Sequence, residues 1–121
     1  MKKLFLIPFL FIILTASAKF GEVSIIPQPA EIQQGKGSFR LRAETTITYD
    51  NPSGKEVAEM LAVKLNQATG FTIKAKNGNG GSIRFNINKE VNSRLGTEGY
   101  SLFVTSKNIT ISANKPAGLF Y

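Results

Sequence analysis

The amino-acid sequence predicts an α+β fold, in which a mixed or antiparallel β-sheet carries helices on one face. Several short segments alternate apolar and polar side chains, which is typical of strands with a single buried face. One segment, residues 54–69, places its apolar side chains at helical spacing and provides a cover for that face. The chain contains no cysteine, so no disulfide supports the fold and the hydrophobic core must be sufficient.

The N-terminus has the features of a secretory signal peptide over residues 1–18. Lys2 and Lys3 form a basic start, residues 4–14 are an almost unbroken apolar run, and residues 16–18 supply the small side chains of a cleavage site. The apolar run is shorter than the roughly 20 residues that a membrane-spanning helix needs, which argues against a membrane anchor. We therefore expect an exported protein, periplasmic or extracellular, whose mature chain begins near residue 19 and keeps no stable membrane anchor.

Six segments have the alternation or the β-branched and aromatic composition of strands. Only the short stretch "TSKN" separates the last two, which predicts an antiparallel hairpin. The glycine-rich residues 77–81 are expected to form a loop. The expected strands are residues 38–42, 46–49, 71–76, 82–88, 100–105 and 109–113. Residues 23–26 form a short apolar stretch, and the chain must leave any central strand at Pro27 and Pro29.

The clearest single element is a helix over residues 54–69. Ser53 and Glu56 have the spacing of a capping box, in which each side chain bonds to a free backbone N–H at the helix start. Gly70 follows the last turn, where a left-handed residue commonly ends a helix. The apolar stripe consists of Val57, Met60, Leu61, Leu65 and Ala68.

One helix is narrow for a sheet of five or six strands, so a second covering helix is expected. Pro116 stands where a helix commonly begins, and "AGLFY" follows it to the last residue. We therefore expect residues 19–121 to form one α+β domain that is truncated within its C-terminal helix.

The composition excludes several kinds of catalytic site. Without cysteine or histidine there is no Cys–His or Ser–His pair, and the usual zinc ligands are missing. Glu56 and Glu59 are expected to be surface charges on the helix, and Glu98 to belong to a turn. The "NGNGG" stretch at residues 77–81 leads into a strand, whereas a phosphate-binding loop leads into a helix. No catalytic, cofactor-binding or metal-binding residue is predicted.

The charge of the chain does not indicate a nucleic-acid partner. The formal net charge is +7, and two of these charges come from Lys2 and Lys3. The remaining basic residues are scattered and form no run, whereas nucleic-acid binders cluster them. We therefore expect a solvated basic surface and no nucleic-acid binding.

The aromatic side chains leave a second kind of function open, that of a free-standing carbohydrate-binding or adhesion module. Phe39, Phe71, Phe85 and Tyr100 could form a platform for sugars, but each falls on an alternating apolar face, which favours packing in the core. A binding module would need aromatic side chains on the polar face of the sheet. Phe103 is the only large aromatic residue expected there.

Two stretches resemble the N-terminal domain of family 20 glycoside hydrolases, the β-N-acetylhexosaminidases. Residues 24–41, "SIIPQPAEIQQGKGSFRL", are similar to the family's opening pattern of Ile-Pro-x-Pro followed by Gly-x-Phe-x-Leu. Residues 98–121, "EGYSLFVTSKNITISANKPAGLFY", are similar to its Glu-Gly-Tyr-x-Leu strand, the paired strand and the Ala-Gly-x-Phe-Tyr helix start. The intervening helix and strand lie in matching order, so the resemblance covers about residues 23–121.

The resemblance implies a structural role. In such enzymes this α+β domain is non-catalytic and packs against a following (β/α)₈ barrel, which holds the catalytic Asp–Glu pair and hydrolyses terminal N-acetylhexosamine from glycans. No position of this chain matches a catalytic or sugar-binding residue of the barrel. The resemblance thus implies a fragment of an exported hexosaminidase that is inactive alone, needs no cofactor, and has the missing barrel as its partner.

Overall fold

The computed structural model describes Ile25 and residues 28–121. The chain divides into two units, residues 1–34 and residues 35–121, of which the second, Gly35–Tyr121, is compact. Within the first unit the described residues form neither helix nor strand. The apolar stretch at residues 23–26 lies outside the described residues except for Ile25, and the expected signal peptide lies outside them entirely.

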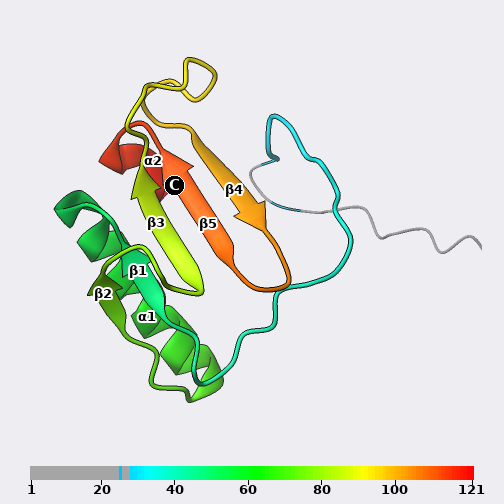
Figure 1. The fold of residues 1–121 in the computed structure, drawn as a ribbon, viewed down its shortest axis with the longest axis vertical. Helices are drawn as coiled ribbons and strands as arrows, with labels where there is room; N and C mark the ends of the chain where they lie inside the picture. Colours follow the sequence, from blue (N-terminus) through cyan, green and yellow to red (C-terminus); the bar gives the residue numbers. More distant parts are fainter. Residues whose placement is uncertain (1–24, 26–27) are drawn as a thin grey trace, which may run out of the picture. The chain divides into compact units, whose positions relative to one another are not determined.

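The second unit is a five-stranded mixed sheet with two α-helices (Figure 1). The strand order is β2-β1-β3-β5-β4, with parallel pairing throughout except for the antiparallel pair β4–β5. The predicted α+β class and the predicted hairpin are therefore confirmed. The elements are β1 (Ile47–Tyr49), a 3₁₀ turn (Pro52–Gly54), α1 (Lys55–Thr69), β2 (Ala75–Asn77), β3 (Ile83–Ile87), β4 (Tyr100–Val104), β5 (Ile109–Ala113) and α2 (Pro116–Phe120).

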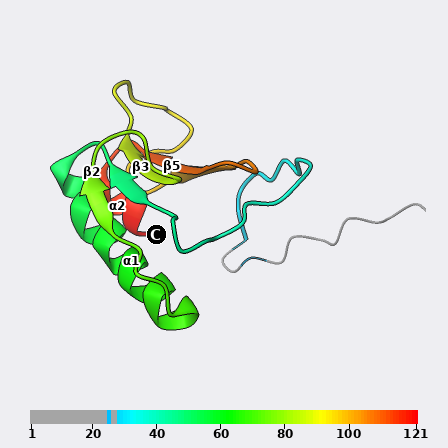
Figure 2. The same ribbon diagram turned by 60° about the horizontal axis from the view of Figure 1, so that its bottom comes forward.

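Both helices lie on the same side of the sheet, as Figure 2 shows. The register aligns the apolar side chains of neighbouring strands on that side: Ile47 pairs with Ile83, and Ile83 with Ile109. The opposite side carries the polar members of the alternation. Because one face is apolar and the other polar, only one needs a cover, as the sequence predicts. The buried apolar core consists of Ile47, Val57, Ala58, Ala62, Ile73, Ile83, Phe85, Ala113 and Leu119.

Helix α1 ends as predicted but begins differently. Gly70 adopts φ 74° and ψ 8°, and its N–H donates to the carbonyl of Asn66, so the left-handed cap is confirmed. The capping box is wrong, because Ser53 lies within the preceding 3₁₀ turn and the α1 cap position is Gly54, which has no capping side chain. Instead Asn51 caps that turn, since its Oδ1 accepts from the N–H of Ser53 at 2.9 Å.

The strand expected over residues 71–76 is wrong at its start, because β2 begins only at Ala75. The side chain of Asn66 on α1 takes the backbone groups that a strand would use. Its Oδ1 accepts from the N–H of Ile73 at 2.7 Å, and its Nδ2 donates to the Ile73 carbonyl at 2.9 Å. Ile73 is nevertheless buried, so the apolar alternation identified the core-facing side chain although the backbone is not paired in a ladder there.

The strand expected over residues 38–42 is also wrong, since this segment is irregular. Phe39 and Leu41 still pack against the core as half-buried side chains. The segment ends in a turn, in which the N–H of Thr45 donates to the carbonyl of Arg42 at 3.0 Å. The alternation therefore identifies the side chains that pack on the core, although the backbone of this segment has no partner strand.

The second helix begins at Pro116, as predicted, and extends to Phe120. Lys115 precedes it in an extended conformation, and proline occupies the first turn, where its missing N–H costs no hydrogen bond. Gly118 and Leu119 are buried against the rest of the domain. In the part of the chain that the structure describes, no helix is long and apolar enough to span a membrane.

Candidate functional site

The carboxylates give no indication of an acid–base site. Glu56, Glu59 and Glu98 are all exposed, and Glu59 forms a 3.8 Å ion pair with Lys55 one turn earlier. Across Ile25 and residues 28–121, no group of acidic side chains could hold a metal ion. The candidate sites are therefore two hollows of the second unit.

The first hollow, which we call the apolar groove, lies on the helix side of the sheet. It has a volume of about 280 Å³. Its walls come from α1, from β4 and β5, and from the C-terminal residues. Leu102 is 51% exposed there, Phe120 59% and Tyr121 74%. The lining residues are Val57, Met60, Leu61, Lys64, Phe85, Tyr100, Leu102, Ile111, Leu119, Phe120 and Tyr121.

The groove exists because the short helix α2 leaves β4 uncovered. All five residues of β4 are exposed, although Tyr100, Leu102 and Val104 lie on the same side as the buried residues of β3. The register places Leu102 opposite Ile111 and Val104 opposite Ile109, so apolar side chains continue from the core to the edge of the sheet. Exposed apolar surface of this kind marks an interaction site.

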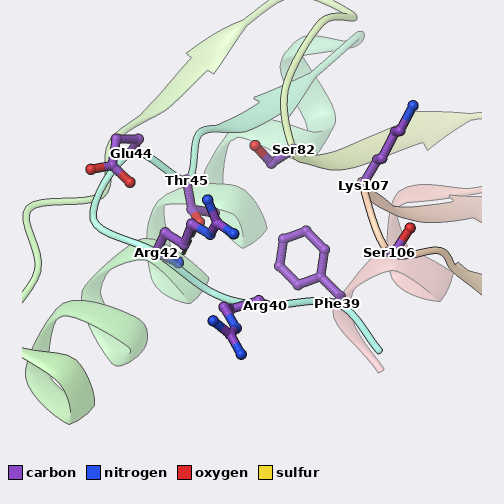
Figure 3. A pocket seen from close by; sticks show the side chains of 8 residues that line it. All are labelled: Phe39, Arg40, Arg42, Glu44, Thr45, Ser82, Ser106 and Lys107. Carbon is purple, nitrogen blue, oxygen red and sulfur yellow. Dashed lines mark hydrogen bonds between the residues drawn. The ribbon is translucent and has the colours of Figure 1, made fainter. Parts of the chain in front are cut away.

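The second hollow, which we call the basic pocket, has a volume of about 500 Å³ (Figure 3). Three of its side chains are cationic and one is acidic. Segments that are distant in sequence meet here: the irregular segment before β1, the residue before β3, and the turn between β4 and β5. The lining residues are Phe39, Arg40, Arg42, Glu44, Thr45, Ser82, Ser106 and Lys107.

Two hydrogen-bonded turns fix the walls of the basic pocket. In the first, the N–H of Arg42 donates to Oγ1 of the buried Thr45 at 2.9 Å. In the second, Oγ1 of Thr105 accepts from the N–H groups of Lys107 and Asn108 at 3.2 and 2.9 Å, and the N–H of Thr105 donates to the carbonyl of Asn108. The backbones that carry Arg42 and Lys107 are therefore both held in place.

The aromatic residues are placed differently from one another. Phe85 is buried, and Phe39 and Phe71 are half-buried against the core, in agreement with the packing prediction. Tyr100 is 41% exposed and lines the apolar groove, so the prediction that it packs in the core is wrong for a large part of its surface. Phe103 is 66% exposed and pairs with Thr110, on the polar side of the sheet.

Sequence reasoning did not identify the basic pocket. Arg42 and Lys107 are far apart in sequence, and neither belongs to a basic run. Only the parallel pairing of β1 with β3 and of β3 with β5 brings their segments to one end of the sheet. The apolar groove was partly foreseeable, since the sequence predicted a cover that stops soon after Pro116.

Comparisons with known proteins identify the class of this domain. The family model "Glycosyl hydrolase family 20, domain 2" matches residues 22–121. The chain belongs to glycosyl hydrolase family 20 and corresponds to the non-catalytic N-terminal domain of these enzymes. A comparison with curated protein sequences finds no match.

Solved structures support the same assignment. The N-acetyl-β-hexosaminidase of Streptomyces plicatus matches with 32% identity and a TM-score of 0.70, over 78% of this chain and 19% of that chain. The family 20 β-N-acetylhexosaminidase of Streptomyces coelicolor A3(2) gives the same values. A chitobiase of Flavobacterium johnsoniae, at 20% identity and a TM-score of 0.64 over 79% of this chain and 16% of that one, shares the fold. The chain thus spans about a fifth of the length of the first two enzymes.

Proposed function

We propose that this chain is the structural N-terminal domain of an exported β-N-acetylhexosaminidase, and that a (β/α)₈ barrel following it in the complete gene product performs the hydrolysis. The basic, apolar and small-residue pattern of residues 1–18 supports export. The family membership and the small share of the related enzymes that the chain spans support a separate catalytic domain.

The apolar groove is the observation that carries the structural role. A row of apolar side chains with about half of their surface exposed would weaken a domain that functioned alone, because burial of one such side chain contributes about 1.5–3 kcal/mol. We propose that polypeptide following Tyr121 continues α2 over Leu102 and Val104. This cover would complete the second helix and connect the domain to the barrel.

The exposed Phe103 is the observation on which the alternative, a carbohydrate-binding module, depends. Its neighbours on the polar face are small hydroxyl side chains, Ser101, Thr110 and Ser112, and no second large aromatic residue accompanies it among the strand pairs. A single ring offers little stacking surface, so the structural role is better supported.

If a separate barrel performs the hydrolysis, residues 19–121 alone should not hydrolyse a chromogenic N-acetylglucosaminide. The reason is that the described carboxylates are exposed and none forms a pair in a cleft. Release of the chromophore is measured against a buffer blank and against the complete gene product as the positive control. Turnover by residues 19–121 clearly above the blank would refute the structural role.

The groove predicts a substitution effect that depends on the length of the chain. In the complete gene product, Leu102→Ser should lower the free energy of unfolding by about 2 kcal/mol, since Leu102 would be buried there. In residues 19–121 alone the change should stay within about 0.5 kcal/mol, because Leu102 is already 51% exposed. Urea unfolding followed by circular dichroism measures both.

Val91→Ser is the matched control, because Val91 is 77% exposed and does not line the groove. It should have a small effect in both chains. Equal effects of Leu102→Ser in the two chains would show that nothing covers the groove.

A further inference from the structure

We propose that the basic pocket is a saccharide site, which binds an acidic sugar whose carboxylate or sulfate group is recognised by Arg42 and Lys107, two of the cations that line it. The inference rests on the proposed function only for the sugar part of the ligand. The anion part follows from the lining itself, which is cationic, hydroxyl-rich and built on one aromatic ring.

The charges of the pocket favour an anion. The pocket is lined by three cationic side chains, those of Arg40, Arg42 and Lys107, and by a single acidic one, that of Glu44. In the part of the chain that the structure describes, none of these four residues forms an ion pair, since the pair between Lys55 and Glu59 lies on α1. In Figure 3 the Glu44 carboxylate points away from the Phe39 ring. The cations are therefore available to an oxyanion, which a guanidinium can bind with two parallel hydrogen bonds.

The arrangement of the side chains suits a ligand of monosaccharide size. Figure 3 shows the Arg42 guanidinium and Ser106 on either side of the Phe39 ring, with Ser82 beyond it. Serine hydroxyls can both donate to and accept from sugar hydroxyls. The half-buried Phe39 ring packs on the core and so offers a fixed apolar surface. A volume of about 500 Å³ lies within the range of small-molecule sites, about 300–1,000 Å³.

The pocket does not suit a nucleic-acid backbone. Such a ligand requires cations repeated along a stripe or groove. Here Arg40 and Lys107 extend in opposite directions from the Phe39 ring, and the cations surround one hollow. A single anionic group on a compact ring fits this geometry better than a polymer of phosphates.

The experiment is a titration of the complete gene product, followed by calorimetry, with four probes: N-acetylglucosamine 6-sulfate, glucuronic acid, neutral N-acetylglucosamine and inorganic sulfate. At least one of the two acidic sugars should bind, and the two arms distinguish sulfate from carboxylate as the recognised group. The catalytic site of the complete gene product would also bind neutral N-acetylglucosamine. The binding that tests the proposal is therefore the binding of the acidic sugar that is lost in the pocket variant described below.

The double variant R42Q/K107Q should weaken binding of the acidic sugar at least about tenfold and leave hydrolysis of a neutral chromogenic substrate unchanged. K74Q/K89Q is the matched control, because it removes the same charge from two exposed residues that line neither the basic pocket nor the apolar groove. Circular dichroism and the unfolding midpoint verify that both variants fold.

The proposal is overturned if no acidic sugar binds, if R42Q/K107Q binds as tightly as the unchanged protein, or if K74Q/K89Q weakens binding equally. Equal affinity for inorganic sulfate and the sulfated sugar overturns the role of Phe39 as a sugar platform. Because the readout is binding, these outcomes are independent of whether the chain supports a catalytic barrel.

Discussion

Replacing Gly118 by alanine should destabilise the domain by about 3 kcal/mol, although the change adds a single methyl group. A Cβ atom at this position would collide with the carbonyl oxygen of Gly99, and would lie 2.9 Å from Cβ of Ala113 and 3.2 Å from the carbonyl oxygen of Glu98. Two of these three atoms belong to backbone, which cannot rotate away. Relief therefore requires α2 to move off the sheet.

The cost is large because α2 is only five residues long and packs closely on the sheet at Gly118. Gly118 is buried, and Ala113, on which it rests, is completely buried at the end of β5. Displacement of α2 would also withdraw the buried Leu119 from the core. Urea unfolding of the complete gene product measures the loss.

Gly80→Ala is the control for Gly118→Ala. No heavy atom lies within 4 Å of a Cβ placed there, and the backbone of Gly80 is not left-handed. Alanine should therefore be neutral or slightly stabilising, because it restricts the unfolded chain. If Gly118→Ala changed the free energy of unfolding no more than Gly80→Ala, the close packing of α2 on the sheet would be incorrect.

The same geometry explains two of the sequence patterns on which the family resemblance depends. Gly99 in "EGY" cannot carry a Cβ, because that atom would collide with the carbonyl oxygen of Leu95. Gly118 in "PAGLFY" approaches Gly99 from the helix side. Gly118 lets α2 approach the start of β4, and Gly99 lets the turn that follows Leu95 close, so each pattern has a steric cause.

Local signals in the sequence were sufficient for the elements that need only near neighbours. Helix α1 was predicted almost to the residue, because its apolar spacing and Gly70 are contained within one short segment. The β4–β5 hairpin was predicted for the same reason, since four residues separate its strands. The second helix was predicted from Pro116.

Non-local features could not be read from the sequence. Alternation in residues 38–42 and 71–74 correctly marked the buried side chains, but whether a backbone finds a partner strand depends on distant segments. The strand order, with β1 between β2 and β3, is likewise set by three parallel pairings. The basic pocket depends on these pairings, which is why its residues were not identified as a group.

Asn114 is the residue for which we expect the largest effect of a single substitution. It follows β5 and is 93% removed from solvent, with a relative exposure of 7%. Its Oδ1 accepts from Nδ2 of Asn88 and from the N–H of Asn92, both at 2.9 Å. Its Nδ2 donates to the carbonyls of Asn92 and Gly96 at 2.7 and 2.8 Å. The amide thus uses all four of its hydrogen-bonding positions.

These bonds fix the connection between β3 and β4, which contains no helix or strand over residues 88–99. Asn114→Ala would remove all four hydrogen bonds of this side chain. A hydrogen bond contributes about 1 kcal/mol net, so we expect a total loss of about 4 kcal/mol. Amide exchange at Asn92 should accelerate with it, because that N–H loses its acceptor.

Asn114→Asp separates hydrogen bonding from volume, because aspartate has nearly the same shape as asparagine. The carboxylate keeps the two accepted bonds but loses both donated ones, and the oxygen that replaces Nδ2 would face the carbonyls of Asn92 and Gly96. Asn114→Asp should therefore also be destabilising, whereas Asn79→Ala, at an exposed loop position, should stay within about 0.5 kcal/mol. Urea unfolding of the complete gene product measures all three variants. A near-native stability of Asn114→Asp would mean that side-chain volume, and not the donated hydrogen bonds, holds the connection in place.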